Sequence, residues 1–242
     1  MNRYLETLFG PNGPSLDGRV LYSRPPFALP MALLVFAFGN LLPLGAMALI
    51  TATTGSTLGI TFLVVIHPLV LMGIILALEG QRGGLASFPL IPVARRELAI
   101  LVLLWPIVLR FVAVLAAAAQ APFGLIAEET NNPLLMDLNM GGVEQAIVVA
   151  SVVLLIPVAE EFFYRDVLYR SLRRMGPWPA AALSSLFWAI MHGSLAFVLP
   201  LFLVGVLLSI LYESTGNLWA PIIAHVGFNL SSFLLILFLP MI

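Results

Sequence analysis

The chain of 242 residues contains no cysteine and no lysine, and only 10% of its residues are charged. Without cysteine, disulfides, thiolate chemistry and cysteine-ligated zinc sites are excluded. A soluble domain would carry about 25% charged residues, so the low charge indicates another class of protein. The net charge of −1 and the lack of a basic stripe give no indication of a nucleic-acid partner.

Hydrophobic residues make up 61% of the chain, and its mean hydropathy is +1.06. These values predict an all-α, polytopic membrane helix bundle, because a spanning helix needs about 20 mostly apolar residues. About seven such stretches are present, and 121–138 would be an eighth if it enters the bilayer. The predicted spans are 27–50, 57–78, 98–119, 143–170, 179–193, 195–211 and 218–239.

The arginines test this count, because cytosolic loops of membrane proteins are enriched in basic residues. Ten of the 11 arginines lie before the first predicted span, between the second and third, or at the end of the fourth. The loops 51–56 and 120–142 contain no basic residue. This alternation predicts a cytosolic N-terminus. Arg110 is the exception, because it lies within the third predicted span and needs a partner or a wet cavity.

We expect three regions along the chain. They are a polar cytosolic tail at 1–26, accessory helices with an external loop at 27–142, and a core at 143–242. The tail lacks the short apolar stretch of a cleavable signal peptide, so the first span is expected to direct insertion. A chain without lysine or cysteine resembles the proteins of high-GC bacteria, and we expect a multi-pass protein of a bacterial cytoplasmic (inner) membrane.

Two adjacent carboxylates, Glu160 and Glu161, follow the apolar run 146–159. Charges next to hydrocarbon cost about 2.5–3.5 kcal/mol each on insertion scales, so they are rare and usually functional. Arg165 lies one turn after Glu161 and can pair with it, whereas Glu160 points about 100° away. One carboxylate could be neutralised in place while the other acts as a general base. A solvated charge cluster at a helix end explains these residues equally well, and it would consist of Glu160, Glu161, Arg165, Asp166, Arg170, Arg173 and Arg174.

Two later histidines each have an aromatic or polar neighbour one turn away. Trp188 and His192 share a helix face, and so do His225 and Asn229. Taken singly, His192 fits a helix-end residue and the second pair fits an interhelical hydrogen-bonding contact. Together, three polar clusters in apolar spans favour a shared site. His67 has no polar residue three or four positions away and is interpreted as structural.

These motifs resemble those of the CPBP family of intramembrane proteases, which groups type II CAAX prenyl endopeptidases with bacteriocin-processing and self-immunity proteins. The family pattern is Glu-Glu-x-x-x-Arg, then Phe-x-x-x-His, then His-x-x-x-Asn/Asp. Here Trp188 stands where the family usually has phenylalanine, and the resemblance covers about 143–232. The residues that match the pattern are Glu160, Glu161, Arg165, His192, His225 and Asn229.

The resemblance implies a glutamate-type intramembrane endopeptidase that requires no cofactor. Glu160 would be the general base, and His192 would help to position the attacking water. His225 and Asn229 would donate hydrogen bonds to the developing oxyanion. The substrate would be a lipidated or membrane-anchored peptide or a bacteriocin-like peptide, and a CAAX-type peptide would serve as a model substrate in vitro. The supporting residues would be Glu161, Arg165 and Trp188.

Several alternatives stay open. A zinc-dependent version of the protease would use Glu160, His192 and His225 as ligands, although the compact His-Glu-x-x-His motif is absent from the sequence. Ser184 or Ser185, about two turns from His192, could be a nucleophile, but no acid–base companion stands out. Outside the enzymes, the chain could be a membrane immunity or scaffold protein. A proton-coupled transporter is a further alternative, although the sequence contains no internal repeat.

Overall fold

The computed structural model describes residues 28–54, 58–80, 88–125 and 142–238. Within these ranges the chain is helical apart from short connections, and no strand is present. The predicted all-α class is therefore confirmed for the part of the chain that the structure describes.

The N-terminal half of the described chain forms three helical runs, two of which contain a wide π-helical turn. The first run is α2 (Leu29–Phe36), η1 (Ala37–Leu41) and α3 (Leu42–Thr54), and the second is α4 (Leu58–Gly80). The third run is α5 (Arg95–Ala99), η3 (Ile100–Leu104), α6 (Trp105–Gln120) and η4 (Ala121–Phe123).

The C-terminal half begins with a long run and continues with three separate helices. The run consists of α8 (Gly142–Ala150), η5 (Ser151–Leu155), α9 (Ile156–Glu161), η6 (Phe162–Tyr169), α10 (Arg170–Leu172) and η7 (Arg173–Met175). The helices are α11 (Pro177–Ile190), α12 (Leu195–Thr215) and α13 (Trp219–Phe238).

The apolar helices make the chain an integral membrane protein, but they differ in length. With its 14 residues, α11 is about 21 Å long, shorter than the roughly 30 Å of a bilayer core. The prediction of seven spans and a cytosolic N-terminus therefore stays a prediction, and most of 121–138 lies outside the described residues. By length and composition, four described runs can cross a membrane: Leu29–Ile50, Arg95–Phe123, Gly142–Met175 and Leu195–Thr215. Shorter apolar helices are Val64–Gly80 and Trp219–Leu235.

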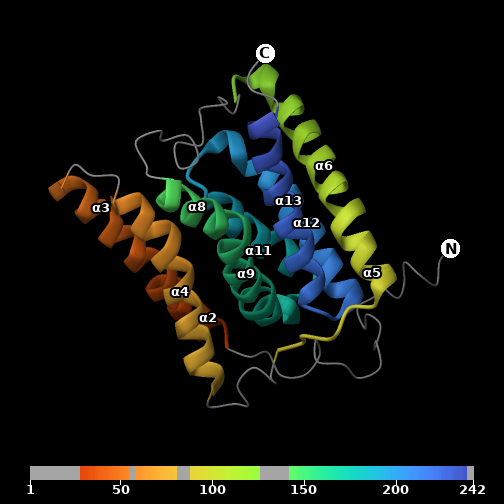
Figure 1. Cartoon of the computed structure of the whole chain (residues 1–242). Coiled ribbons are helices and arrows are strands. Elements are labelled where there is room, and N and C mark those ends of the chain that lie inside the picture. Colours follow the sequence, from red (N-terminus) through yellow and green to blue (C-terminus); the bar gives the residue numbers. More distant parts are fainter. Residues whose placement is uncertain (1–27, 55–57, 81–87, 126–141, 239–242) are drawn as a thin grey trace.

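The long fourth run lies in the middle of the bundle. Figure 1 shows α9, α11, α12 and α13 there, with α3 and α4 along one side and α6 along the other. Packing joins α9 to both α4 and α13, and α12 to α6, α11 and α13. Apolar side chains from several helices, including Leu71, Leu109 and Leu208, form the buried core. The carboxylates at the end of α9 are consequently surrounded by other helices.

Three prolines inside the helical runs are each preceded by a wide turn. Pro43, Pro106 and Pro157 each follow the end of a π-helical segment by two residues. A proline has no N–H, and its ring clashes with the preceding turn, so a regular helix is disturbed there. In each case the residue before the proline donates to the carbonyl five residues earlier, as Ile156 N does to Ser151 O. The wide turn thus accommodates the proline within a continuous run.

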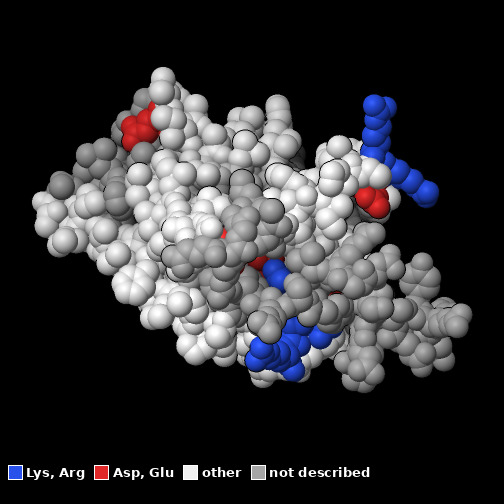
Figure 2. Space-filling model, turned by 90° about the horizontal axis from the view of Figure 1, so that it is seen from below, with Lys and Arg blue, Asp and Glu red and all other residues white. Residues whose placement is uncertain are grey.

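Exposed arginines gather at one end of the bundle. Arg95 and Arg96 begin α5, and Arg174 lies in η7 at the end of the fourth run. Figure 2 looks at this end from below and shows arginine side chains there. In contrast, Arg110 lies within α6.

Candidate active site

The end of α9 places its two carboxylates in different surroundings. The Glu161 side chain is completely buried, whereas 14% of the Glu160 side chain is exposed. Adjacent positions on a helix point about 100° apart, which explains the difference. The site therefore has one enclosed carboxylate and one that a small molecule can reach.

Glu161 is held between two basic side chains. Arg165 Nε lies 3.1 Å from Glu161 Oε2, and His225 Nδ1–H donates to Glu161 Oε1 at 2.8 Å. The predicted pairing of Glu161 with Arg165 is therefore confirmed. A buried carboxylate is costly unless it is paired, so these contacts stabilise its charged form in place.

Arg165 connects this pair to α11 and α12. Its Nη2 donates to the Gly205 carbonyl at 3.3 Å, and its guanidinium carbon lies 5.3 Å from the centroid of the Trp188 ring. A Cβ at Gly205 would lie 2.8 Å from Ser185 Cβ and 3.1 Å from Trp188 Cε3. The missing side chain at Gly205 thus allows α12 to approach α11 closely beside the site.

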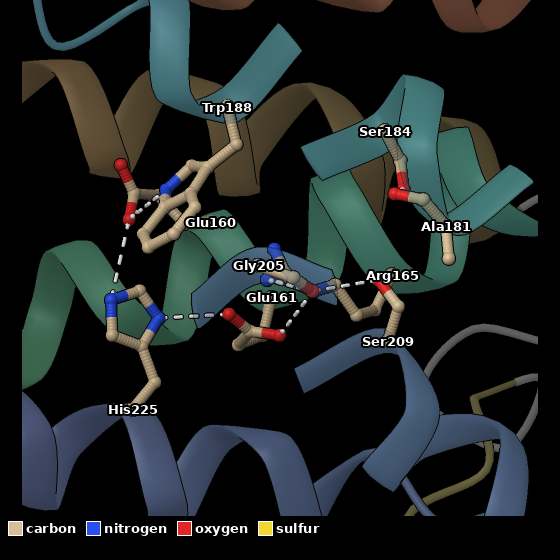
Figure 3. Close-up of polar contacts among 9 residues, drawn as sticks. All are labelled: Glu160, Glu161, Arg165, Ala181, Ser184, Trp188, Gly205, Ser209 and His225. Atoms are coloured by element: carbon tan, nitrogen blue, oxygen red, sulfur yellow. Dashed lines mark hydrogen bonds and ion pairs between the residues drawn. The ribbon is translucent and has the colours of Figure 1, made fainter. Parts of the chain in front are cut away.

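Glu160 is contacted through one of its two oxygens (Figure 3). Trp188 Nε1–H donates to Glu160 Oε2 at 2.9 Å. His225 Nε2 lies 3.8 Å from the same oxygen, which is longer than a hydrogen bond. His225 therefore lies between the two carboxylates, with one ring nitrogen toward each.

His192 lies at the turn that joins α11 to α12, and it is exposed. Its Nδ1–H donates to the Trp188 carbonyl at 2.9 Å, and its ring meets the Trp188 ring edge-on at a centroid distance of 5.1 Å. Because a carbonyl can only accept, the proton lies on Nδ1 and Nε2 is the free position. The contacts of the described residues join His192 to Glu160 only through Trp188.

Asn229 is placed by the wide turn that precedes Glu160. In an α-helix Val152 O would accept from Ile156 N, but that N–H donates to Ser151 O. In the π pattern its donor would be residue 157, which is proline and has no N–H. Asn229 Nδ2 donates to this carbonyl at 2.9 Å. Asn229 thus satisfies a backbone group that Pro157 leaves without a donor.

The part of the chain that contains the candidate site matches a known protein family. Residues 142–231 match the family model described as type II CAAX prenyl endopeptidase Rce1-like. This segment, called the Rce1-like segment below, is similar to that family. The resemblance inferred from the motifs is confirmed over it, and all the proposed site residues lie within it.

A curated relative matches less than half of the chain. The chain is 30% identical over 108 residues to a protein of Bacillus subtilis (strain 168) named "Putative membrane peptidase YdiL". The match covers 44% of this chain and 43% of that protein, so it spans less than half of either. No solved structure matches the chain significantly.

The Rce1-like segment does not gather the alternative zinc ligands into a metal site. Among the residues that the structure describes, no three His, Cys, Asp or Glu side chains could hold a metal ion together. Glu160 and His225 approach each other, but His192 is turned toward the carbonyl of its own helix. The arrangement in this structure does not fit a three-ligand zinc site.

The two serines of α11 lie in the packing between helices. Ser184 Oγ donates to the Ala181 carbonyl at 3.3 Å, and Ser185 is completely buried against Gly205. Within the described ranges, Ser185 Oγ has no hydrogen-bond partner, and the hydrogen bond of Ser184 goes to a backbone carbonyl. This geometry gives no support to a serine nucleophile.

The interpretation of the charges as a solvated helix-end cluster is wrong for most of them. Glu161, Arg165, Asp166 and Arg170 are all buried. Asp166 pairs with Arg170 at 2.7 Å and accepts from Tyr212 Oη at 2.9 Å. The cluster is therefore enclosed by α12 and α13, which the local sequence could not indicate.

Two polar residues outside the Rce1-like segment also find partners across helices. His67 Nε2 lies 3.0 Å from Asn40 Oδ1. The partner of His67 thus lies on another helical run, and its interpretation as structural stays a prediction. Arg110 Nη2 donates to the Phe228 carbonyl at 2.9 Å, and its guanidinium lies 4.3 Å from the centroid of the Phe228 ring. Further acceptors of Arg110 are Ser231 and Ser232.

Proposed function

We propose that the chain is a glutamate-type intramembrane endopeptidase that hydrolyses a peptide bond of a membrane-associated substrate. One observation carries the proposal. A partly exposed carboxylate, Glu160, lies beside a completely buried carboxylate that Arg165 pairs with and His225 contacts. Such a division leaves one carboxylate free for proton transfer and gives the other a supporting role. The match of this segment to a peptidase family supports the same reaction class.

In the proposed reaction, Glu160 removes a proton from a water molecule as the water oxygen bonds to the scissile carbonyl carbon. The free Nε2 of His192 accepts a hydrogen bond from the same water and orients it. The carbonyl oxygen becomes an oxyanion. The C–N bond then breaks, and the proton on Glu160 moves to the leaving nitrogen. The products are a carboxylic acid and an amine, and the enzyme forms no covalent intermediate.

The proposed oxyanion donors are His225 and Asn229. The oxyanion needs a proton on His225 Nε2, the nitrogen that faces Glu160. Asn229 uses one of its two amide hydrogens on Val152 O and keeps the second for the substrate. Removing one preorganised donor at such a site typically costs about 3–4 kcal/mol of transition-state stabilisation.

The exposure of the site side chains supports a direction from which a substrate would approach Glu160. Glu161 is enclosed, Glu160 is partly exposed, and His192 is exposed at the α11–α12 turn. A substrate would therefore enter from the His192 side. We propose a membrane-anchored or lipidated peptide as the substrate class, with a CAAX-type peptide as the first probe. The arginine-rich end would face the cytosol of a bacterium, in its inner membrane.

The test is cleavage of a membrane peptide by the purified full chain in proteoliposomes. Glu160→Gln and His192→Ala should each abolish cleavage, and Glu97→Gln, on the exposed first turn of α5, should not. If the biological function survives in both site variants, the chain is an immunity or scaffold protein. Loss of cleavage after chelation, restored by Zn²⁺, would instead support the zinc-dependent version.

A further inference from the structure

Trp188 contacts more of the candidate site than any proton-transfer group does. Its N–H donates to Glu160, and its ring meets the rings of His192 and His225 edge-on, each at a centroid distance of 5.1 Å. The Arg165 guanidinium lies against the same ring. A phenylalanine ring could make similar edge contacts, but it has no N–H. The hydrogen bond to Glu160 is therefore a property of the indole alone.

The indole itself has little freedom to move. Trp188 is 1% exposed, and a Cβ at Gly205 would lie 3.1 Å from its ring. The direction of the N–H is thus fixed by packing before any substrate arrives. Donors held in this way act without reorganisation during a reaction.

The bond also distinguishes the two oxygens of Glu160. In the part of the chain that the structure describes, the hydrogen bond from Trp188 and the approach of His225 both involve Oε2. Figure 3 shows the second carboxylate oxygen pointing away from both groups. The final torsion of a glutamate is broad, so without a fixed contact its oxygens would exchange places easily.

We propose that Trp188 is a positioning residue that anchors Oε2 of Glu160 and so directs Oε1 to the attacking water. The inference rests on the proposed function, because it assigns the proton transfer to one oxygen of the proposed base. It adds a requirement that the base must be held by an N–H from α11. That requirement can be examined both with and without cleavage.

The hydrogen bond can be tested without activity by labelling the four tryptophans with ¹⁵N and recording their indole N–H signals in detergent. The Trp188 signal is the one that Trp188→Phe removes. Glu160→Ala should move this signal upfield more than the other three, because its acceptor is lost. Glu97→Ala, at an exposed position, should move none of them. A Trp188 signal that ignores Glu160→Ala would overturn the proposal.

The kinetic test compares Trp188→Phe with Trp219→Phe, since Trp219 is 39% exposed at the start of α13. Trp188→Phe should lower kcat about tenfold or more with little change in KM, because a hydrogen bond to a charged group is lost. Trp219→Phe should change neither value. If kcat is unchanged in Trp188→Phe, although the Trp188 signal of the wild type responds to Glu160→Ala, the hydrogen bond has no positioning role. That result would overturn the proposal.

The two measurements separate this inference from the proposed function. If the wild type cleaves no membrane peptide, the proposed function fails whatever the indole signals show. If the wild type cleaves and Trp188→Phe cleaves equally well, only the positioning role fails. If Trp188→Phe unfolds at a lower temperature, it is compared with Trp188→Tyr, which keeps an aromatic side chain but has no indole N–H and should lose kcat equally.

Discussion

The side-chain amide of Asn229 donates to the backbone carbonyl of Val152 at 2.9 Å, and Pro157 is the reason that this carbonyl is free. The bond joins α13 to the wide turn that leads into Glu160. A residue proposed as an oxyanion donor therefore also fixes the backbone of the helix that carries the proposed base. The two roles predict different responses to substitution.

Asn229→Ala should destabilise the protein by about 1–3 kcal/mol, because it leaves the half-buried Val152 carbonyl without a donor. In a Pro157→Ala background the cost should be smaller, since residue 157 then has an N–H for that carbonyl. Thermal unfolding of the four proteins in detergent gives the coupling. Equal costs in both backgrounds would show that Asn229 does not compensate for Pro157. Cleavage that stays low in the double variant would identify the oxyanion role separately.

The two adjacent glutamates should fail in different ways. Glu160→Gln should abolish cleavage and leave the unfolding temperature close to that of the wild type, because its side chain is partly exposed. Glu161→Gln should lower the unfolding temperature, since Arg165 would lose its buried carboxylate partner. Cleavage and unfolding are measured on the same preparations. Similar effects of the two substitutions on both quantities would remove the distinction between base and support.

Arg165→Met should destabilise the fold by about 3–5 kcal/mol, because Glu161 would stay buried without its guanidinium. The double variant Glu161→Gln/Arg165→Met should recover much of that stability, as both charges are then gone. Arg174→Met, at an exposed position of η7, is the matched control and should change little. If Arg165→Met were as stable as the wild type, water would have to reach Glu161 and replace the lost guanidinium.

Gly227→Ala should disturb the contact between α13 and α6. A Cβ at Gly227 would lie 2.5 Å from Pro106 Cγ, and a proline ring cannot rotate away. Overpacking of this kind costs about 1–3 kcal/mol, and moving α13 would also displace His225 and Asn229. Gly73→Ala in α4 is the control, because nothing lies within 4 Å of the added Cβ. Normal stability and cleavage in Gly227→Ala would show that the helices separate easily here.

The sequence alone located the helices and one pair within the site. The apolar runs have the length of helices, and helical periodicity places residues four apart on one face. The pairing of Glu161 with Arg165 is such a local relationship, and it is present. The same periodicity indicated that Glu160 would point elsewhere, and its exposure agrees.

Periodicity within one helix could not reveal contacts between helices. It found no polar residue one turn from His67 and could not show that Asn40, in another run, is its partner. It also left open a solvated charge cluster, although Asp166 and Arg170 are enclosed with Tyr212 of α12. The contact of His67 with Asn40 and the burial of Asp166 and Arg170 both depend on which helices pack against each other.

The helical class and the polar side chains that each helix carries therefore follow from the order of the amino acids alone. The hydrogen bonds from Trp188 to Glu160, from His225 to Glu161 and from Asn229 to the backbone near Pro157 arise when the helices pack together. The physical reason is the range of the interactions. Turn-to-turn contacts follow from the helix itself, whereas contacts between helices depend on close approaches such as those at Gly205 and Gly227.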